Sequence, residues 1–202
     1  MPKPRSEMIA ETRAKLITAA RHAFGTIGYA GASMDDFTGE AGLTRGALYH
    51  HFGDKKGLLQ AVVMEIDAEM TERLNQVSAA AATRWQGFVD ECAAYIEMAL
   101  EPEIQRIMFR DGPAVLGDLS QLQNTPGCIA SLSRSIDRLK ADGEMIDIDT
   151  ETAARLINGA SAHMALWIAK AEEPEAVSKV AVAGFRAMLD GLRRGGRRPE
   201  VD

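Results

Sequence analysis

The chemically distinctive part of this chain is the stretch GLTRGALYHHFGDKKGL, which covers residues 42–58. It combines basic side chains, two adjacent histidines, a tyrosine and four glycines with a short apolar framework. The chain as a whole is acidic, with 23 Lys and Arg against 29 Asp and Glu, whereas residues 1–60 hold eight basic and six acidic side chains. A slightly positive segment on an acidic protein indicates a surface that meets a polyanion.

On a helix over residues 44–52, Leu48 and Phe52 are four positions apart and share a face, which we expect to pack on the preceding helix. The opposite side consists of small residues flanked by polar aromatic ones: Gly46, Ala47, Tyr49, His50 and His51. A glycine inside a helix costs about 1 kcal/mol. Gly46 therefore suits a helix whose backbone a partner must approach closely, as DNA would.

Basic and aromatic side chains around this helix have the chemistry for nucleic-acid contacts. Arg45 can reach a guanine edge or a phosphate, and Tyr49 can pack on a thymine methyl or donate to a phosphate. Lys55 starts the next helix, where free backbone N–H groups also attract phosphate. The His50–His51 pair disfavours a zinc site, because adjacent residues point about 100° apart on a helix and no Cys or carboxylate cluster accompanies them.

The remaining chain predicts helices almost throughout, because apolar and polar residues nowhere alternate for long. The expected spans are 6–27, 33–42, 44–52, 54–80, 84–101, 103–110, 117–123, 127–141, 150–171 and 174–194. Gly28 and Gly31 should break the first helix, and the stretch DGPAVLG at 111–117 should break another. The predicted fold class is all-α: an N-terminal three-helix head with a helix-turn-helix, followed by a larger helical body.

Local signals mark where the head's helices begin. Ser33 with Asp36 three residues later resembles a capping box, and Thr44 and Asp54 are suitable N-caps. A helix, a glycine-containing turn and a second short helix make up the helix-turn-helix arrangement. Its second helix enters the major groove of DNA while the first crosses the phosphate backbone.

The same residues carry a family resemblance: residues 9–58 resemble the DNA-binding domain of the TetR family of bacterial transcriptional regulators. The matching positions are Ala41-Gly42-Leu43-Thr44, Gly46, Tyr49, His51-Phe52, Lys55 and Leu58, with Phe24, Gly28-Tyr29 and Ser33 upstream. One departure is Phe37-Thr38, where the family often has Ile-Ala. We interpret this departure as a packing change.

The resemblance implies which residues touch DNA. Phosphate contacts would come from positions equivalent to Ser33, Thr44, Tyr49, His51 and Lys55. Base contacts would come from Arg45, Gly46, Ala47 and His50. Ser33 and Thr44 also have a purely structural interpretation as helix caps, and the sequence leaves both roles open.

The resemblance also implies the domain organisation: residues 1–53 as the DNA-binding domain, 54–194 as a helical ligand-binding and dimerisation domain, and 195–202 as a tail. The last two long helices would pair with a second copy, so that the homodimer reads a palindromic operator; a monomer core is the alternative. An unidentified small molecule would be the effector, and no cofactor or metal is expected. Polar or aromatic groups within apolar helices are the pocket candidates: Tyr95, Met98, Phe109, Arg110, His163 and Trp167.

Several functions compete at this stage. The sequence favours a ligand-released repressor, and an architectural or division-related DNA-binding protein without a ligand is the alternative. An enzyme is not expected, because no nucleophile elbow, metal-ligand spacing or phosphate loop occurs. We expect Cys92 and Cys128 to be buried thiols, and a redox-sensing role for them is the alternative. The N-terminus lacks a signal-peptide pattern and no run approaches about 18 apolar residues, so we expect a cytoplasmic protein without membrane spans.

Overall fold

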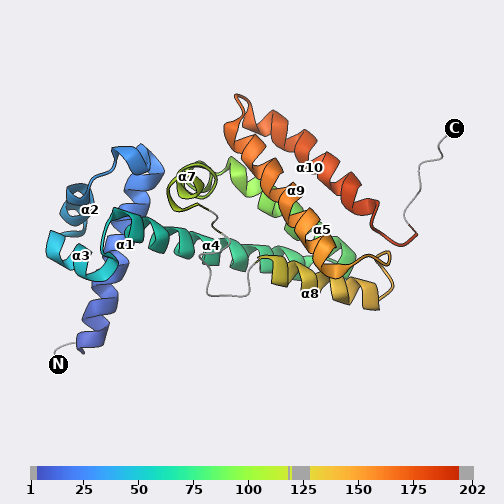
Figure 1. Ribbon diagram of the computed structural model, residues 1–202, viewed down its shortest axis with the longest axis horizontal. Coiled ribbons are helices and arrows are strands. Elements are labelled where there is room, and N and C mark those ends of the chain that lie inside the picture. The colour runs from blue at the N-terminus through green and yellow to red at the C-terminus, as the bar shows by residue number, and fades with distance from the viewer. Residues whose placement is uncertain (1–3, 118, 120–127, 196–202) are drawn as a thin grey trace. The chain divides into compact units, whose positions relative to one another are not determined.

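The computed structural model describes residues 4–117, 119 and 128–195, and it confirms the all-α fold (Figure 1). Among these residues the β pairing is limited to an isolated bridge between Met145 and Arg193. The elements are α1 (Arg5–Gly31), α2 (Met34–Ala41), α3 (Arg45–Phe52), α4 (Lys55–Ala80), α5 (Arg84–Glu97), the 3-10 turn η1 (Met98–Leu100), α6 (Pro102–Arg106), the π-helical turn η2 (Ile107–Asp111), α7 (Gly112–Leu116), α8 (Cys128–Ala141), α9 (Thr150–Lys170) and α10 (Pro174–Asp190).

The chain forms two compact units. The first combines Met1–Ala68 with Pro102–Leu122, and the second combines Glu69–Glu101 with Gln123–Asp202. The first unit includes the start of α4, where Leu58, Leu59 and Val62 are fully buried. It also includes α6 and η2, which pack against α1. This boundary differs from the one expected after residue 53, and the functional division at that residue stays a prediction.

The core of the first unit forms between α1, α2 and α3. Phe24, Phe37 and Leu48 are fully buried there. The rings of Phe24 and Phe37 meet edge to face, with centroids 5.1 Å apart, an arrangement that adds to the stabilisation from burial alone. The large Phe37 side chain therefore fills space against another aromatic side chain.

The predicted helix caps of the head are confirmed. Ser33 and Asp36 form the reciprocal capping box, with the Ser33 N–H donating to Asp36 Oδ2 at 2.7 Å. The Thr44 hydroxyl accepts from the Ala47 N–H at 3.3 Å and caps α3. At the start of α4, Asp54 Oδ1 accepts from the Gly57 N–H at 2.7 Å. These contacts satisfy amides that a helix leaves free in its first turn.

The glycines near the end of α1 act as predicted, because Gly28 has a φ of 80° and kinks the helix, which then ends at Gly31. The break expected at residues 111–117 was wrong. The stretch 111–117 does not interrupt the helical backbone. The π turn η2 passes into α7, and the chain leaves helical geometry at Gly117, with a φ of 83°. Apart from residues 117 and 119, the predicted helix at 117–123 lies outside the described residues.

In the second unit, α9 packs against α5, α8 and α10 around buried side chains that include Ile96, Ile157 and Phe185. The last helix ends at Asp190, four residues earlier than expected. The residues that follow turn back instead, and the Arg194 N–H donates to the Glu144 carbonyl at 2.8 Å. Of the predicted tail, only residue 195 is described. In the described parts of the chain, no helix has both the length and the apolar character needed to cross a membrane.

Candidate nucleic-acid interface

Helix α3 has a buried side and a bare side, as its sequence predicts. Leu48 is fully buried against the head. Phe52 is only partly covered, and the Arg13 guanidinium lies 5.5 Å from the centre of its ring. On the other side, Arg45, Gly46 and His50 are exposed, as is Tyr49 with 54% of its surface accessible. The helix thus presents small and polar aromatic residues to solvent.

The fold of this chain does not require glycine at position 46. A Cβ at this position would meet only the Thr44 hydroxyl, at 3.8 Å, which is ordinary contact. Gly57 shows the contrast, because a Cβ there would lie 2.1 Å from the Phe52 carbonyl oxygen. Since neither backbone conformation nor internal packing requires glycine at 46, its small size leaves room for an external partner.

The two hydroxyl residues of the interface are exposed and act as caps. Ser33 caps α2 and Thr44 caps α3, each through its side-chain oxygen. Their capping role is therefore visible in the structure. A hydroxyl that accepts from a backbone amide still has its own hydrogen to donate, so the caps do not prevent contact with a phosphate.

Arg45 is held by an acidic partner that the sequence analysis missed. Its guanidinium donates to both carboxylate oxygens of Asp35 on α2, with Nε at 2.5 Å from Oδ1. The hydrogen bond from Arg45 lowers the pKa of the Asp35 carboxyl. Both side chains are exposed, so the pair contributes little stability. The pair joins the start of α3 to the start of α2. Because Asp35 and Arg45 are ten residues apart and lie on different helices, helical spacing could not predict that they pair.

Lys55 faces an aromatic ring at the start of α4. Its ammonium lies 4.3 Å from the centre of the Tyr29 ring, a cation–π geometry. Burial, with a smaller contribution from the Asp54 charge, raises the pKa of Tyr29. The His50 and His51 rings meet edge to face at 5.3 Å. Within the described ranges, no group of three or more His, Cys, Asp or Glu side chains is arranged as a metal site.

The predicted pocket residues differ in how exposed they are. In the second unit, Met98 is buried and Tyr95 half-buried, but His163 and Trp167 are exposed on α9. In the first unit, Phe109 is buried and Arg110 exposed. An open hollow of about 440 Å³ on the second unit has a different lining: Glu97, Leu100, Glu175, Ser178, Lys179 and Val182. The ligand pocket stays a prediction.

Exposed apolar side chains follow one stripe on each of the last two helices. On α9, Leu156 is 62% exposed and Trp167 is 47% exposed, with His163 between them at helical spacing. On α10, Val180 is 60% exposed and Met188 is 42% exposed. Other residues of these two helices are buried in the chain's own core, namely Ala153, Ile157, Ala181, Phe185 and Leu189.

Comparisons with known proteins agree with this architecture. Residues 16–62 match the family "Bacterial regulatory proteins, tetR family", and residues 85–192 match "Tetracyclin repressor-like, C-terminal domain". A TetR-family transcriptional regulator from Pectobacterium atrosepticum, known as a crystal structure, is 49% identical. The match covers 96% of this chain and all of that one, with a TM-score of 0.86.

Two further proteins are similar to this chain over a shorter stretch or in fold alone. The HTH-type transcriptional repressor AcnR of Corynebacterium jeikeium is 38% identical over 72 residues, which are 36% of this chain and 38% of AcnR. RolR in complex with resorcinol is 21% identical, with 91% of this chain and 90% of that one covered and a TM-score of 0.69, a likeness in fold alone. With matches to both its head and its body, this chain belongs to the TetR family of transcriptional regulators, which carry a helix-turn-helix DNA-binding head.

Proposed function

We propose that this chain is a repressor that binds a palindromic operator as a homodimer and is released by a small molecule. The observation that carries the proposal is the bare side of α3, where Tyr49 is exposed and a Cβ at Gly46 would meet almost nothing. A helix with this profile fits the major groove at close range.

In this proposal, base edges meet Arg45, Gly46, Ala47 and His50, while phosphates meet the remaining predicted contacts: Ser33, Thr44, Tyr49, His51 and Lys55. Arg45 would leave Asp35 and gain a guanine or a phosphate. Its loss of Asp35 costs little, because that pair is solvent-exposed. Phosphate contacts set affinity and register, and base contacts set sequence preference.

The exposed stripes on α9 and α10 support the homodimer. Four large apolar side chains at helical spacing are costly to leave in water. A Cβ at Gly159 or Gly184, on the same two helices, would meet nothing within 4 Å. A two-fold dimer joins such a patch to itself, and an operator with two equivalent half-sites follows from that symmetry.

The dimer can be tested with a matched pair of substitutions. Val180→Glu should give a folded monomer that no longer binds operator tightly, as measured by sedimentation equilibrium and circular dichroism. Val77→Glu is the control, because Val77 is also exposed in the second unit but lies on α4, outside both stripes. A dimeric Val180→Glu protein would contradict this interface.

The proposal of a small-molecule effector is supported by a structural relative, because RolR is known in complex with resorcinol. A ligand releases DNA only if it binds the DNA-free conformation more tightly than the DNA-bound one. A thermal-shift screen of chemically diverse small molecules separates this proposal from its alternative, an architectural or division-related protein of the same fold. No stabilising compound across the screen would favour the alternative.

Selection of bound sequences from a random DNA pool is the central experiment. We expect enrichment of a palindrome that the wild-type chain binds as a dimer. Recovery of sequences without any shared motif, at affinities equal to those of unrelated DNA, would refute the operator proposal.

A further inference from the structure

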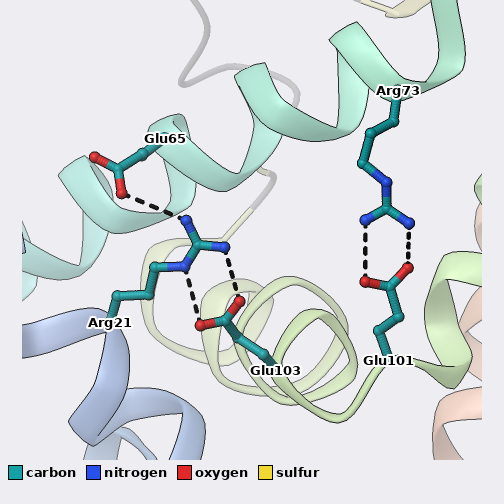
Figure 2. Close-up of polar contacts among 5 residues, drawn as sticks. All are labelled: Arg21, Glu65, Arg73, Glu101 and Glu103. Carbon is teal, nitrogen blue, oxygen red and sulfur yellow. Dashed lines mark hydrogen bonds and ion pairs between the residues drawn. The ribbon is translucent and has the colours of Figure 1, made fainter. Parts of the chain in front are cut away.

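The segment Pro102–Asp111, made of α6 and η2, is fastened to α1 by charged side chains. Figure 2 shows the Arg21 guanidinium of α1 between two carboxylates. It donates to Glu103 through Nε at 2.9 Å and through Nη2 at 2.8 Å, and Nη1 lies 3.4 Å from Glu65 Oε1 on α4. Paired, bidentate geometry of this kind fixes orientation as well as distance.

Two further side chains of this segment bind the backbone of α1 at its kink. In an unbroken α-helix the Tyr29 N–H and the Gly25 carbonyl would pair with each other. At the Gly28 kink, the Tyr29 N–H donates to Asp111 Oδ2 at 2.7 Å. The Gly25 carbonyl accepts from Arg106 Nη1 at 3.3 Å, and the same nitrogen also donates to the Thr26 carbonyl. Side chains about 80 positions away in the sequence therefore form hydrogen bonds with the backbone groups at the kink.

The π turn explains how one short segment supplies both side chains. Arg106 and Asp111 are five residues apart, which is the hydrogen-bond spacing of a π turn, so both lie on one side of it. The Gly112 N–H closes the turn on the Ile107 carbonyl. A Cβ at Gly112 would lie 2.6 Å from that oxygen, which makes glycine necessary there. Gly28 is similarly restricted, because its φ is positive and Asp111 Oδ2 lies 3.3 Å from where a Cβ would be.

Tyr29 links this kink to the DNA-facing surface. Its amide is held by Asp111 and its ring lies against the Lys55 ammonium at 4.3 Å. We propose that Asp111 is a positioning residue for DNA binding, which acts through Tyr29 to hold Lys55 at the start of α4, where a phosphate would bind. The inference rests on the proposed function, because it assigns a role to a residue that does not itself face DNA.

The test measures operator affinity and its salt dependence for Asp111→Ala, Lys55→Ala and the double variant of the full chain. Asp111→Ala should weaken operator binding roughly two- to fivefold, the factor expected for loss of an exposed cation–π contact. The slope of log K against log salt should flatten towards that of Lys55→Ala. In the double variant, the Asp111 substitution should add no further loss, since both changes remove the same contact. A purely structural role for Asp111 would leave the salt slope unchanged and make the two losses additive.

Asp149→Ala is the matched control. Asp149 also accepts a backbone amide with its carboxylate, from Thr152 at 2.8 Å, but it caps α9 in the second unit. This variant should lose a carboxylate–amide hydrogen bond comparable to the one that Asp111→Ala loses, and it should keep wild-type operator affinity. If Asp111→Ala does not fold, Tyr29→Leu tests the same link. This variant keeps the hydrogen bond from the backbone N–H of residue 29 to Asp111 and removes only the aromatic ring.

The outcomes separate the two proposals. Wild-type affinity and salt slope in Asp111→Ala, or in Tyr29→Leu, would overturn the positioning role, as would additive losses in the double variant. If the wild-type chain itself selects no operator, the proposed function fails first. If the wild type binds an operator and Tyr49→Ala does not, while Asp111→Ala binds normally, only the positioning role fails.

Discussion

Replacing Gly46 by alanine should stabilise the protein and weaken its binding to DNA. Alanine is favoured over glycine by up to about 1 kcal/mol inside a helix. Gly46 is the second residue of α3, and its added Cβ meets only the Thr44 hydroxyl at 3.8 Å. We therefore expect a gain of about 0.5 kcal/mol, which corresponds to a rise in Tm of roughly 1–2 °C for a chain of this size.

The effect on DNA binding has the opposite sign if α3 lies against the floor of the major groove. A methyl group forced into a filled interface costs about 1–3 kcal/mol. Operator affinity should then fall roughly five- to 150-fold. Because a general loss of stability cannot raise Tm and weaken binding together, the combination identifies a steric effect at the interface.

Thermal unfolding and fluorescence anisotropy with labelled operator provide the two measurements. Gly39→Ala is the matched control: Gly39 lies on α2, a Cβ there would meet nothing within 4 Å, and it is not among the predicted DNA contacts. It should show a similar rise in Tm with unchanged affinity. Wild-type or tighter operator binding by Gly46→Ala would refute the close approach of α3 to DNA.

Three further substitutions test individual side chains of the head. Tyr49→Ala should abolish operator binding while circular dichroism and sedimentation show an unchanged fold and dimer, because Tyr49 is exposed and supports no core; binding as tight as wild type would contradict the groove assignment. Lys55→Ala should weaken binding to all DNA sequences alike and flatten the salt slope by about one unit, and a sequence-selective loss would instead assign Lys55 to base contact. Asp35→Asn should release Arg45 from its exposed partner and raise affinity for random DNA more than for operator in competition titrations. A purely structural role for the Asp35–Arg45 pair predicts unchanged affinity for both DNAs.

The sequence alone determined the local features of the head. The capping box at Ser33 and the caps at Thr44 and Asp54 depend on hydrogen bonds between residues three positions apart, and the inward side of α3 at Leu48 follows its helical periodicity. Such contacts follow from helical periodicity and from hydrogen bonding in the first turn. They are readable without knowledge of the rest of the fold, and together they placed α3 with its bare side outward.

The tertiary structure decided which residues meet across long separations. Tyr29 and Asp111 are 82 positions apart, and no spacing rule connects a helix kink with a carboxylate on a later π turn. The exposure of Trp167 was equally hidden, because α9 carries apolar residues on several sides and only its packing against α5, α8 and α10 selects the side left in solvent. Periodicity reports that a helix has an apolar face, whereas the choice between its own core and an outside partner depends on how the whole unit packs.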